Sequence, residues 1–199
     1  MFDNRLRKQF APAIDGTGRW LARRGVPAIG LTAFGFTAGI AGCVALAFRF
    51  DDFALACLVL NRLSDLLDGA VARATRVTDF GGFADIVGDL IVYSGFVLGF
   101  AIGRPEHAIP AASLIFTFVA TGSSFLAAAI IAAKRNVCLE PREKKSFFYN
   151  AAIAEGTETA IVLALICLFP NLFNIIAYVF LSVCWLSVVG HLRFALKYR

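Results

Sequence analysis

Two apolar stretches decide the fold: FALACLVLNRLSDLLDGAVAR at residues 53–73 and FGGFADIVGDLIVYSGFVLGFAIG at residues 80–103. Each is long enough for a helix that crosses the roughly 30 Å of hydrocarbon in a bilayer. The link between them, ATRVTD at residues 74–79, is short, so we expect two antiparallel neighbouring helices. Both stretches also carry carboxylates, which are rare in membrane spans.

Four more apolar stretches of similar length flank this pair, at residues 26–48, 108–133, 148–168 and 172–196. Hydrophobic residues make up 59% of the 199-residue chain and charged residues 17%. Ordinary soluble domains have roughly 45–50% and about 25%. This composition excludes a soluble globular enzyme, a disordered chain and a disulfide scaffold. We therefore predict an all-α, polytopic membrane protein whose single domain, 1–199, has about six transmembrane helices at residues 26–199.

Residues 1–25 precede the first of these stretches and are predicted to form an amphipathic helix in the membrane interface. Phe2, Leu6 and Phe10 recur at the helical period, with basic residues between them. We expect Pro12 to interrupt this helix, because proline lacks the backbone N–H of a helix interior.

The positions of lysine and arginine predict the orientation. Arg49 and Arg104 are the basic residues in the odd-numbered connections, and Arg62 lies inside the second stretch. All other lysines and arginines lie near the termini or in the even-numbered connections. We therefore expect a multi-pass protein of the cell or inner membrane with both termini and the active site on the cytoplasmic side. This bias in the loops also accounts for the net charge of +5, so no nucleic-acid partner is expected.

The carboxylates of the central pair of stretches form a pattern. Asp65 and Asp68 are spaced i, i+3, and Asp85 and Asp89 are spaced i, i+4, so each pair lies on one helix face. Each acidic group in a span costs about 2.5–3.5 kcal/mol even on lenient scales. In an antiparallel helix pair, the four carboxylates are expected to converge at one depth, where they would repel each other unless cations lie between them.

Three interpretations of this cluster are open from spacing alone. Oxygen ligands suit Mg²⁺, and two such ions about 3.5–4 Å apart can hold a phosphoryl group. Gly69 leaves room beside the carboxylates for a diphosphate, and Arg73 could hold a phosphate oxygen. Paired carboxylates also occur in cation-coupled transporters, and one of them could pair structurally with Arg62 or Arg73.

The motif resembles a known signature. Asp65-Leu-Leu-Asp68-Gly69-Ala-Val-Ala72-Arg73, followed by Gly81-x-x-x-Asp85-x-x-x-Asp89, matches every fixed position of the D-x-x-D-G-x-x-A-R…G-x-x-x-D-x-x-x-D pattern of CDP-alcohol phosphatidyltransferases. The expected six spans and the N-terminal interfacial helix are also similar to that family.

The resemblance implies a reaction in which an acceptor hydroxyl attacks the phosphorus of a CDP-linked lipid and CMP is released. It implies that Asp65, Asp68 and Asp85 bind two Mg²⁺ or Mn²⁺ ions, and that Asp89 is the catalytic base and a further metal ligand. It also implies a homodimer. The residues that the resemblance places against the CDP moiety are Gly69, Ala72, Arg73 and Gly81.

The sequence departs from the family's pattern at one place. Residues 26–32 are similar to an Asn-x-x-Thr stretch of the family, but Ile29 stands where the asparagine is expected. Thr32 remains a candidate for contact with the CDP-lipid, and helix packing is its alternative role.

Acceptor binding is assigned to residues outside the motif. Glu155 and Glu158 are spaced i, i+3 near the start of the fifth stretch, where they either line an acceptor cavity or pair with Lys134, Arg135 or Arg62. Lys134 and Arg135 end the fourth stretch, where they either bind an acceptor phosphate or anchor the helix in the interface.

Two other functions remain as alternatives. A cation-coupled transporter would use the aspartates as its ion site, but such proteins often have paired internal repeats, which this chain lacks. An intramembrane prenyltransferase also binds Mg-diphosphate through aspartates, but usually has a longer chain and different motifs. We therefore expect an enzyme whose partners are a CDP-lipid donor, a polar alcohol acceptor and the surrounding membrane lipids.

Overall fold

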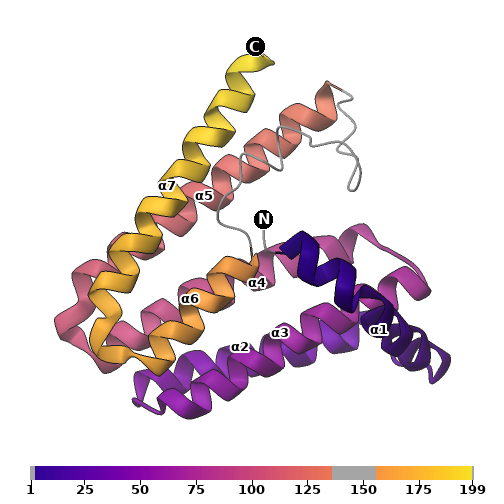
Figure 1. Ribbon diagram of the computed structural model, residues 1–199, viewed down its shortest axis with the longest axis horizontal. Coiled ribbons are helices and arrows are strands. Elements are labelled where there is room, and N and C mark those ends of the chain that lie inside the picture. Colours follow the sequence, from indigo (N-terminus) through magenta and orange to yellow (C-terminus); the bar gives the residue numbers. More distant parts are fainter. Residues whose placement is uncertain (1–2, 136–155, 199) are drawn as a thin grey trace.

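The computed structural model describes residues 3–135 and 156–198, and every regular element within these ranges is a helix. The prediction of an all-α protein is therefore confirmed. Figure 1 shows the arrangement of the elements. They are α1 (Asp3–Arg23), α2 (Ala28–Ala47), α3 (Asp51–Ala74), α4 (Asp79–Gly103), the 3₁₀ helix η1 (Pro105–His107), α5 (Ala108–Lys134), α6 (Gly156–Leu168), the 3₁₀ helix η2 (Pro170–Leu172) and α7 (Phe173–Lys197).

Four of these segments are long and apolar enough to cross a membrane: α2, α4, η1 with α5, and η2 with α7. The chain is thus an all-α membrane protein. Helix α3 has 24 residues and would extend roughly 36 Å, although its charged residues set it apart from the other four. Helix α6 is apolar but has 13 residues in the described range. Six spans remain the prediction for the whole chain.

The ends of the central helices follow from local sequence. The Thr78 side chain caps α4 by accepting a hydrogen bond from the backbone N–H of Gly81 (3.1 Å), which satisfies one of the unpaired donors of the first turn. Gly25 adopts a positive φ of 77° just after α1, a conformation that glycine tolerates best. The Thr78 cap starts α4 shortly after α3 ends, so the link between them is short, as expected. The expected close packing of α3 on α4 was wrong, because α2 packs against both helices and they contact each other little.

Helix α1 differs from the expectation in one respect, because it continues through Pro12. The expected interruption was wrong. The second half of α1 packs closely on α3: a Cβ added to Gly18 would lie 2.5 Å from the Cβ of Ala70. Asp15 also pairs with Arg73 at 2.8 Å. These contacts with α3 offset the one backbone hydrogen bond that a proline removes.

Glycines let α3 and α4 each pack closely against α2. A Cβ on Gly35 would lie 2.7 Å from Ser64 of α3, and a Cβ on Gly39 would lie 2.6 Å from Val92 of α4. In the other direction, a Cβ on Gly99 of α4 would lie 2.1 Å from the backbone oxygen of Cys43 in α2. Small residues at such contacts are a common means of packing helices in membranes. The three helices therefore form a compact unit that carries the motif.

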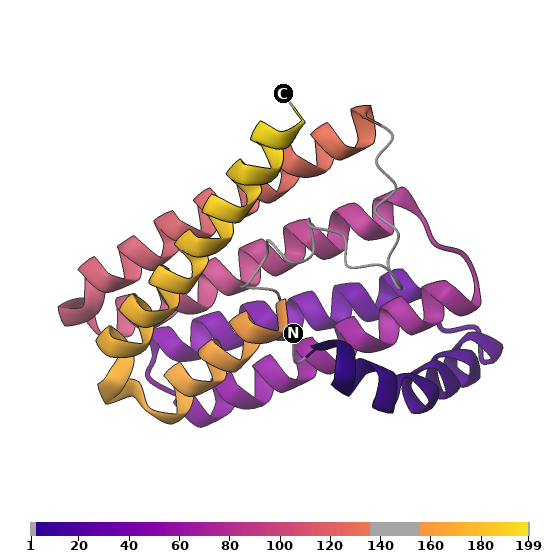
Figure 2. The same cartoon turned by 45° about the horizontal axis from the view of Figure 1, so that its top comes forward.

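Helices α5 and α7 form a second unit. They pack along each other, and at their far ends Ala128 and Ala132 of α5 are buried with Phe194 of α7. In Figures 1 and 2 this pair leaves the remaining helices at an angle, so that its far end stands apart from them. Near the other end, Phe173 of α7 stacks on Phe100 of α4 with ring centroids 4.2 Å apart, which joins the two units.

Candidate active site

Helices α3 and α4 bring three of the motif carboxylates together. One carboxylate oxygen from each of Asp65, Asp85 and Asp89 lies within 4.8 Å of the other two. The i, i+4 spacing of Asp85 and Asp89 places both on one face of α4. A set of three carboxylates is a hard oxygen donor set of the kind that Mg²⁺ and Mn²⁺ bind, so these residues fit a divalent metal.

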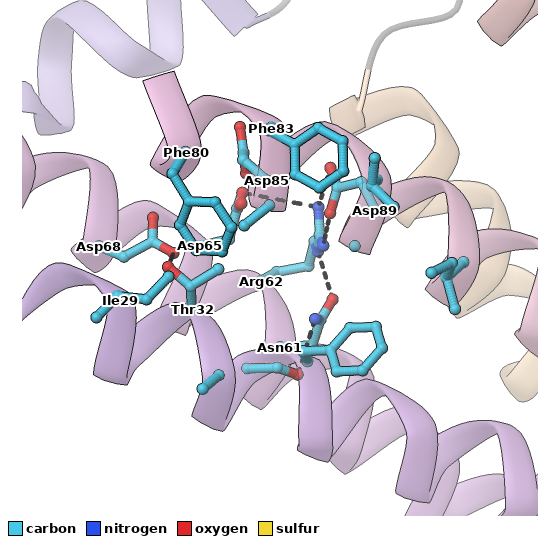
Figure 3. A pocket seen from close by; sticks show the side chains of 17 residues that line it. Ile29, Thr32, Asn61, Arg62, Asp65, Asp68, Phe80, Phe83, Asp85 and Asp89 are labelled. Carbon is cyan, nitrogen blue, oxygen red and sulfur yellow. Dashed lines mark hydrogen bonds and ion pairs between the residues drawn. The ribbon is translucent and has the colours of Figure 1, made fainter. Parts of the chain in front are cut away.

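Asp68 lies beside this group and has its own partner. The hydroxyl of Thr32, on α2, donates a hydrogen bond of 2.6 Å to Oδ2 of Asp68. Asp68 is largely buried, with 9% of its surface exposed. Figure 3 shows both side chains at one side of the acidic group. The site is therefore built from three helices, because α2 orients a carboxylate of α3.

Arg62 of α3 lies among the acids and ties α3 to α4. Its guanidinium forms a two-pronged ion pair with Asp89: Nη2 bonds to Oδ1, and Nη1 donates to Oδ2 at 3.2 Å. Nη1 also donates to the hydroxyl of Tyr93 at 2.6 Å and lies 3.7 Å from Oδ2 of Asp65. The hydroxyl of Tyr93 in turn donates to Oδ2 of Asp89 at 2.8 Å. Asp89 is thus engaged by an arginine and a tyrosine together.

The position of Arg62 is itself held by a hydrogen-bond chain. Its Nε donates to Oδ1 of Asn61 at 2.8 Å, and Nδ2 of Asn61 donates to the backbone oxygen of Gly35 on α2 at 2.9 Å. Asn61 is buried, at 5% exposure. Buried polar groups that are fully paired in this way keep a single arrangement, so the guanidinium has a defined place in the site.

The acids open into a cavity of about 380 Å³ between α2, α3 and α4. Its lining combines the acids with apolar side chains that include Ile29, Phe36 and Phe83. Figure 3 shows Ile29 and Phe83 around the acidic group. Ile29, which stands where the family pattern has asparagine, therefore contributes an apolar surface to this cavity. The lining consists of Ile29, Thr32, Ala33, Gly35, Phe36, Asn61, Arg62, Asp65, Asp68, Phe80, Phe83, Ala84, Asp85, Val87, Gly88, Asp89 and Ile91.

The other motif residues do not line this cavity. Arg73 of α3 pairs with Asp15 of α1, and the nearest atom to a Cβ added at Gly69 would be Nη1 of Arg73, at 3.3 Å. Gly81 lies at the cap of α4, where a Cβ would meet Oγ1 of Thr78 at 3.0 Å. Ala72, in the last turn of α3, is likewise absent from the lining.

The residues predicted to bind the acceptor lie elsewhere. Glu158 is in the first turn of α6, and Glu155 lies outside the described residues. The start of α6 is close to the acids, since the backbone oxygen of Gly156 lies 3.5 Å from the Tyr93 hydroxyl. Lys134 and Arg135 border a different cavity of about 350 Å³, between the far ends of α5 and α7.

Sequence reasoning did not assign Asn61 or Tyr93 to the site, and considered Arg62 as an ion-pair partner only. A signal for each is present in the sequence. Arg62 is a charged residue inside an apolar stretch, three residues before Asp65, and Tyr93 lies one helical turn after Asp89. Their joint contact with Asp89 depends on how α3 and α4 both pack on α2, which spacing alone does not fix.

Comparison with known proteins agrees with this geometry. The family model described as CDP-alcohol phosphatidyltransferase matches residues 26–192. The chain is 40% identical over 188 residues to inner membrane protein YnjF of Escherichia coli K12, a match that covers 94% of this chain and 91% of that protein. It is also 30% identical over 101 residues to archaetidylinositol phosphate synthase of Pyrococcus horikoshii, covering 50% of this chain and 54% of that protein. The motif, its convergence around one cavity and the family match over most of the chain show that this protein belongs to the CDP-alcohol phosphatidyltransferase family.

Proposed function

We propose that this phosphotransferase transfers a phosphatidyl-type group from a CDP-linked lipid, such as CDP-diacylglycerol, to the hydroxyl of a polar alcohol, and releases CMP. The proposal rests above all on one observation: the motif carboxylates Asp65, Asp85 and Asp89 come together from two helices at a cavity that apolar side chains also line. Such a cavity suits a donor that joins a charged diphosphate to a lipid. The acyl chains would extend from it into the membrane.

The roles of the residues follow from their chemistry. Asp65, Asp68, Asp85 and Asp89 would hold two Mg²⁺ or Mn²⁺ ions, and these ions supply positive charge for the diphosphate and for the departing CMP. Asp89 accepts the proton of the acceptor hydroxyl, whose oxygen forms a bond to phosphorus while the bond from phosphorus to the CMP oxygen breaks. Thr32 keeps Asp68 in place through its hydrogen bond. Gly69, Ala72, Arg73 and Gly81 are proposed to contact the nucleotide from the outer side of the motif.

The acceptor is proposed to enter from the side of α6. The backbone of Gly156 lies close to Tyr93 and therefore close to the proposed base, so α6, which carries Glu158 in its first turn, begins near the acids. We include Glu155 in the proposal from its spacing in the sequence. The carboxylates of Glu155 and Glu158 would hydrogen-bond to acceptor hydroxyls. Lys134 and Arg135, at the other cavity, would attract an acceptor that carries phosphate.

We also propose that the termini and the acids face the cytoplasm, and that the protein acts as a homodimer, as the family resemblance implies. The distribution of lysine and arginine leaves two arginines, Arg49 and Arg104, at the end of the protein that would face away from the cytoplasm. Their contacts support this orientation. Arg49 donates to the backbone oxygen of Gly103 at 2.7 Å, and Arg104 pairs with Asp51 at 2.6 Å. Both arginines therefore have partners within the protein.

The reaction can be tested directly with the purified protein in detergent. The protein is incubated with CDP-diacylglycerol, Mg²⁺ or Mn²⁺ and a panel of polar alcohols, and CMP release and lipid products are measured. We expect acceptor-dependent CMP release that EDTA abolishes and that Asp89→Asn lowers at least about 100-fold. Asp52→Asn is the matched control, because Asp52 is an exposed carboxylate at the opposite end of α3. If no alcohol supports CMP release by the folded protein, the proposal is wrong.

A further inference from the structure

Arg62 is a cation that the chain itself places inside the proposed metal site. Its side chain is 18% exposed and is held from behind by Asn61, which is anchored on the backbone of α2. Its two outer nitrogens reach Asp89, and one of them also lies 3.7 Å from Asp65. The guanidinium therefore stands between two of the three carboxylates that converge (Figure 3).

Both carboxylate oxygens of Asp89 therefore already accept hydrogen bonds from side chains of the protein itself. Oδ1 accepts from Arg62, and Oδ2 accepts from both Arg62 and Tyr93. A two-pronged pair of this kind is among the strongest hydrogen-bonded contacts of a carboxylate. A divalent ion at Asp89 would have to displace the guanidinium or lie beside it, and two cations so close together repel each other strongly away from bulk water.

The remaining acids are placed differently. Asp68 accepts a neutral hydroxyl from Thr32, and Asp65 is too far from Arg62 for a hydrogen bond. Asp65 and Asp85 belong to the convergent group and Asp68 lies beside it, so these three would offer a first divalent ion a position that needs no displacement of Arg62. The four carboxylates are thus divided into a set of three that can take a metal and one that an internal cation occupies.

The donor would change this division. Its diphosphate brings negative charge into the cavity that Arg62 also lines, and phosphate oxygens suit the planar guanidinium as well as a carboxylate does. We propose that Arg62 occupies the place of the second divalent ion until the CDP-lipid binds, so that the chain alone holds one ion and takes up the second together with the donor. The same movement frees Asp89 to act as the base. This inference rests on the proposed function.

The prediction is a change in metal stoichiometry, which can be counted without turnover. Mn²⁺ is titrated into the purified full chain in detergent and bound ions are counted by electron paramagnetic resonance, with and without CDP-diacylglycerol in the micelles and with no alcohol acceptor. We expect one ion per chain without the nucleotide lipid and two with it. In Arg62→Gln, we expect two ions without the lipid, the second binding at least about tenfold more tightly than in the wild type.

Two further variants separate the charge of Arg62 from its structural role. Arg62→Lys retains one positive charge beside Asp89 and is expected to keep the wild-type stoichiometry. Arg104→Gln removes the other buried Arg–Asp pair between α3 and α4, far from the acids, and is expected to lower stability without changing the count. Size-exclusion profiles and thermal unfolding establish which variants are folded.

The outcomes are distinguishable. Two ions bound by the wild type without the lipid, or one ion bound by Arg62→Gln under both conditions, would overturn the inference and leave the proposed function standing. If Arg62→Gln does not fold, the comparison of the wild type with and without the lipid still decides. No Mn²⁺ binding in any folded variant, with or without the lipid, would contradict the proposed function itself.

Discussion

At the scale of single residues, the geometry of the site depends on which hydrogen-bond donor or cation contacts each carboxylate. The Thr32 hydroxyl has one proton and two oxygens within reach: Oδ2 of Asp68 at 2.6 Å and the backbone oxygen of Ala28 at 3.2 Å. The shorter contact is to the charged group, which makes the stronger hydrogen bond. Thr32 is therefore better described as a residue that positions Asp68 than as a packing residue of α2.

This assignment predicts the effect of two variants at position 32. Thr32→Val keeps the shape of the side chain but removes the hydroxyl, so Asp68 is no longer oriented from α2. Loss of a group that orients a metal ligand typically weakens metal binding about 10–100-fold, and we expect a loss in this range for Mn²⁺ in calorimetric titrations. Thr32→Ser retains the hydroxyl and should bind as the wild type does. Equal affinities for Thr32→Val and the wild type would show that Asp68 does not need this bond.

At the scale of helices, the distance between α2 and α4 is set by backbone atoms. Gly99 has no side chain at the point where α4 meets the carbonyl group of Cys43. A backbone carbonyl cannot rotate away as the end of a flexible side chain can, so any Cβ here must separate the helices. The contact fixes α4 against α2 on the same three-helix unit that orients Asp68 and Asp89.

Two alanine substitutions on α4 test this packing. In Gly99→Ala, the new Cβ would lie 2.1 Å from the Cys43 oxygen, so we expect a loss of stability of about 1–3 kcal/mol, the usual range for overpacking. Gly82→Ala has nothing within 4 Å and should stabilise the helix by up to about 1 kcal/mol. The free energy of unfolding is measured by titration with a denaturing detergent. A similar change in both variants would mean that the close contact does not limit the packing.

The same elements show how far the sequence predicts this protein. The apolar runs predicted α2 to α5 and α7 to within two residues at each end, because a membrane span needs a continuous apolar length. The spacing of Asp65, Asp85 and Asp89 predicted that they meet, because helical periodicity and a short link determine that contact. Periodicity does not predict that α1 continues through Pro12 or that Arg73 faces Asp15, since both depend on how α1 docks on α3.

At the scale of the whole molecule, two ion pairs join α3 to α4, one near the middle of both helices and one at an end. Arg62 and Asp89 form one pair at the cavity, and Arg104 and Asp51 form the other where the chain leaves α4. The second pair is enclosed: the two side chains are 12% and 19% exposed, and Arg104 also lies over the ring of Phe100 at 4.5 Å. The first pair lines the cavity, whereas neither residue of the second pair does.

This difference predicts a distinct result for a double-mutant cycle at the second pair. Asp51→Asn and Arg104→Gln each leave one buried charge uncompensated, so we expect each to lower the free energy of unfolding by about 3–5 kcal/mol. The double variant removes both charges and should be less destabilised than the sum of the two, because neighbouring groups do not act independently. Denaturing-detergent titration gives the stabilities, and the Mn²⁺ count per folded chain should stay unchanged in all three variants. Additive losses would show that Asp51 and Arg104 do not depend on each other, and a changed ion count would show that this end of α3 and α4 is coupled to the acids.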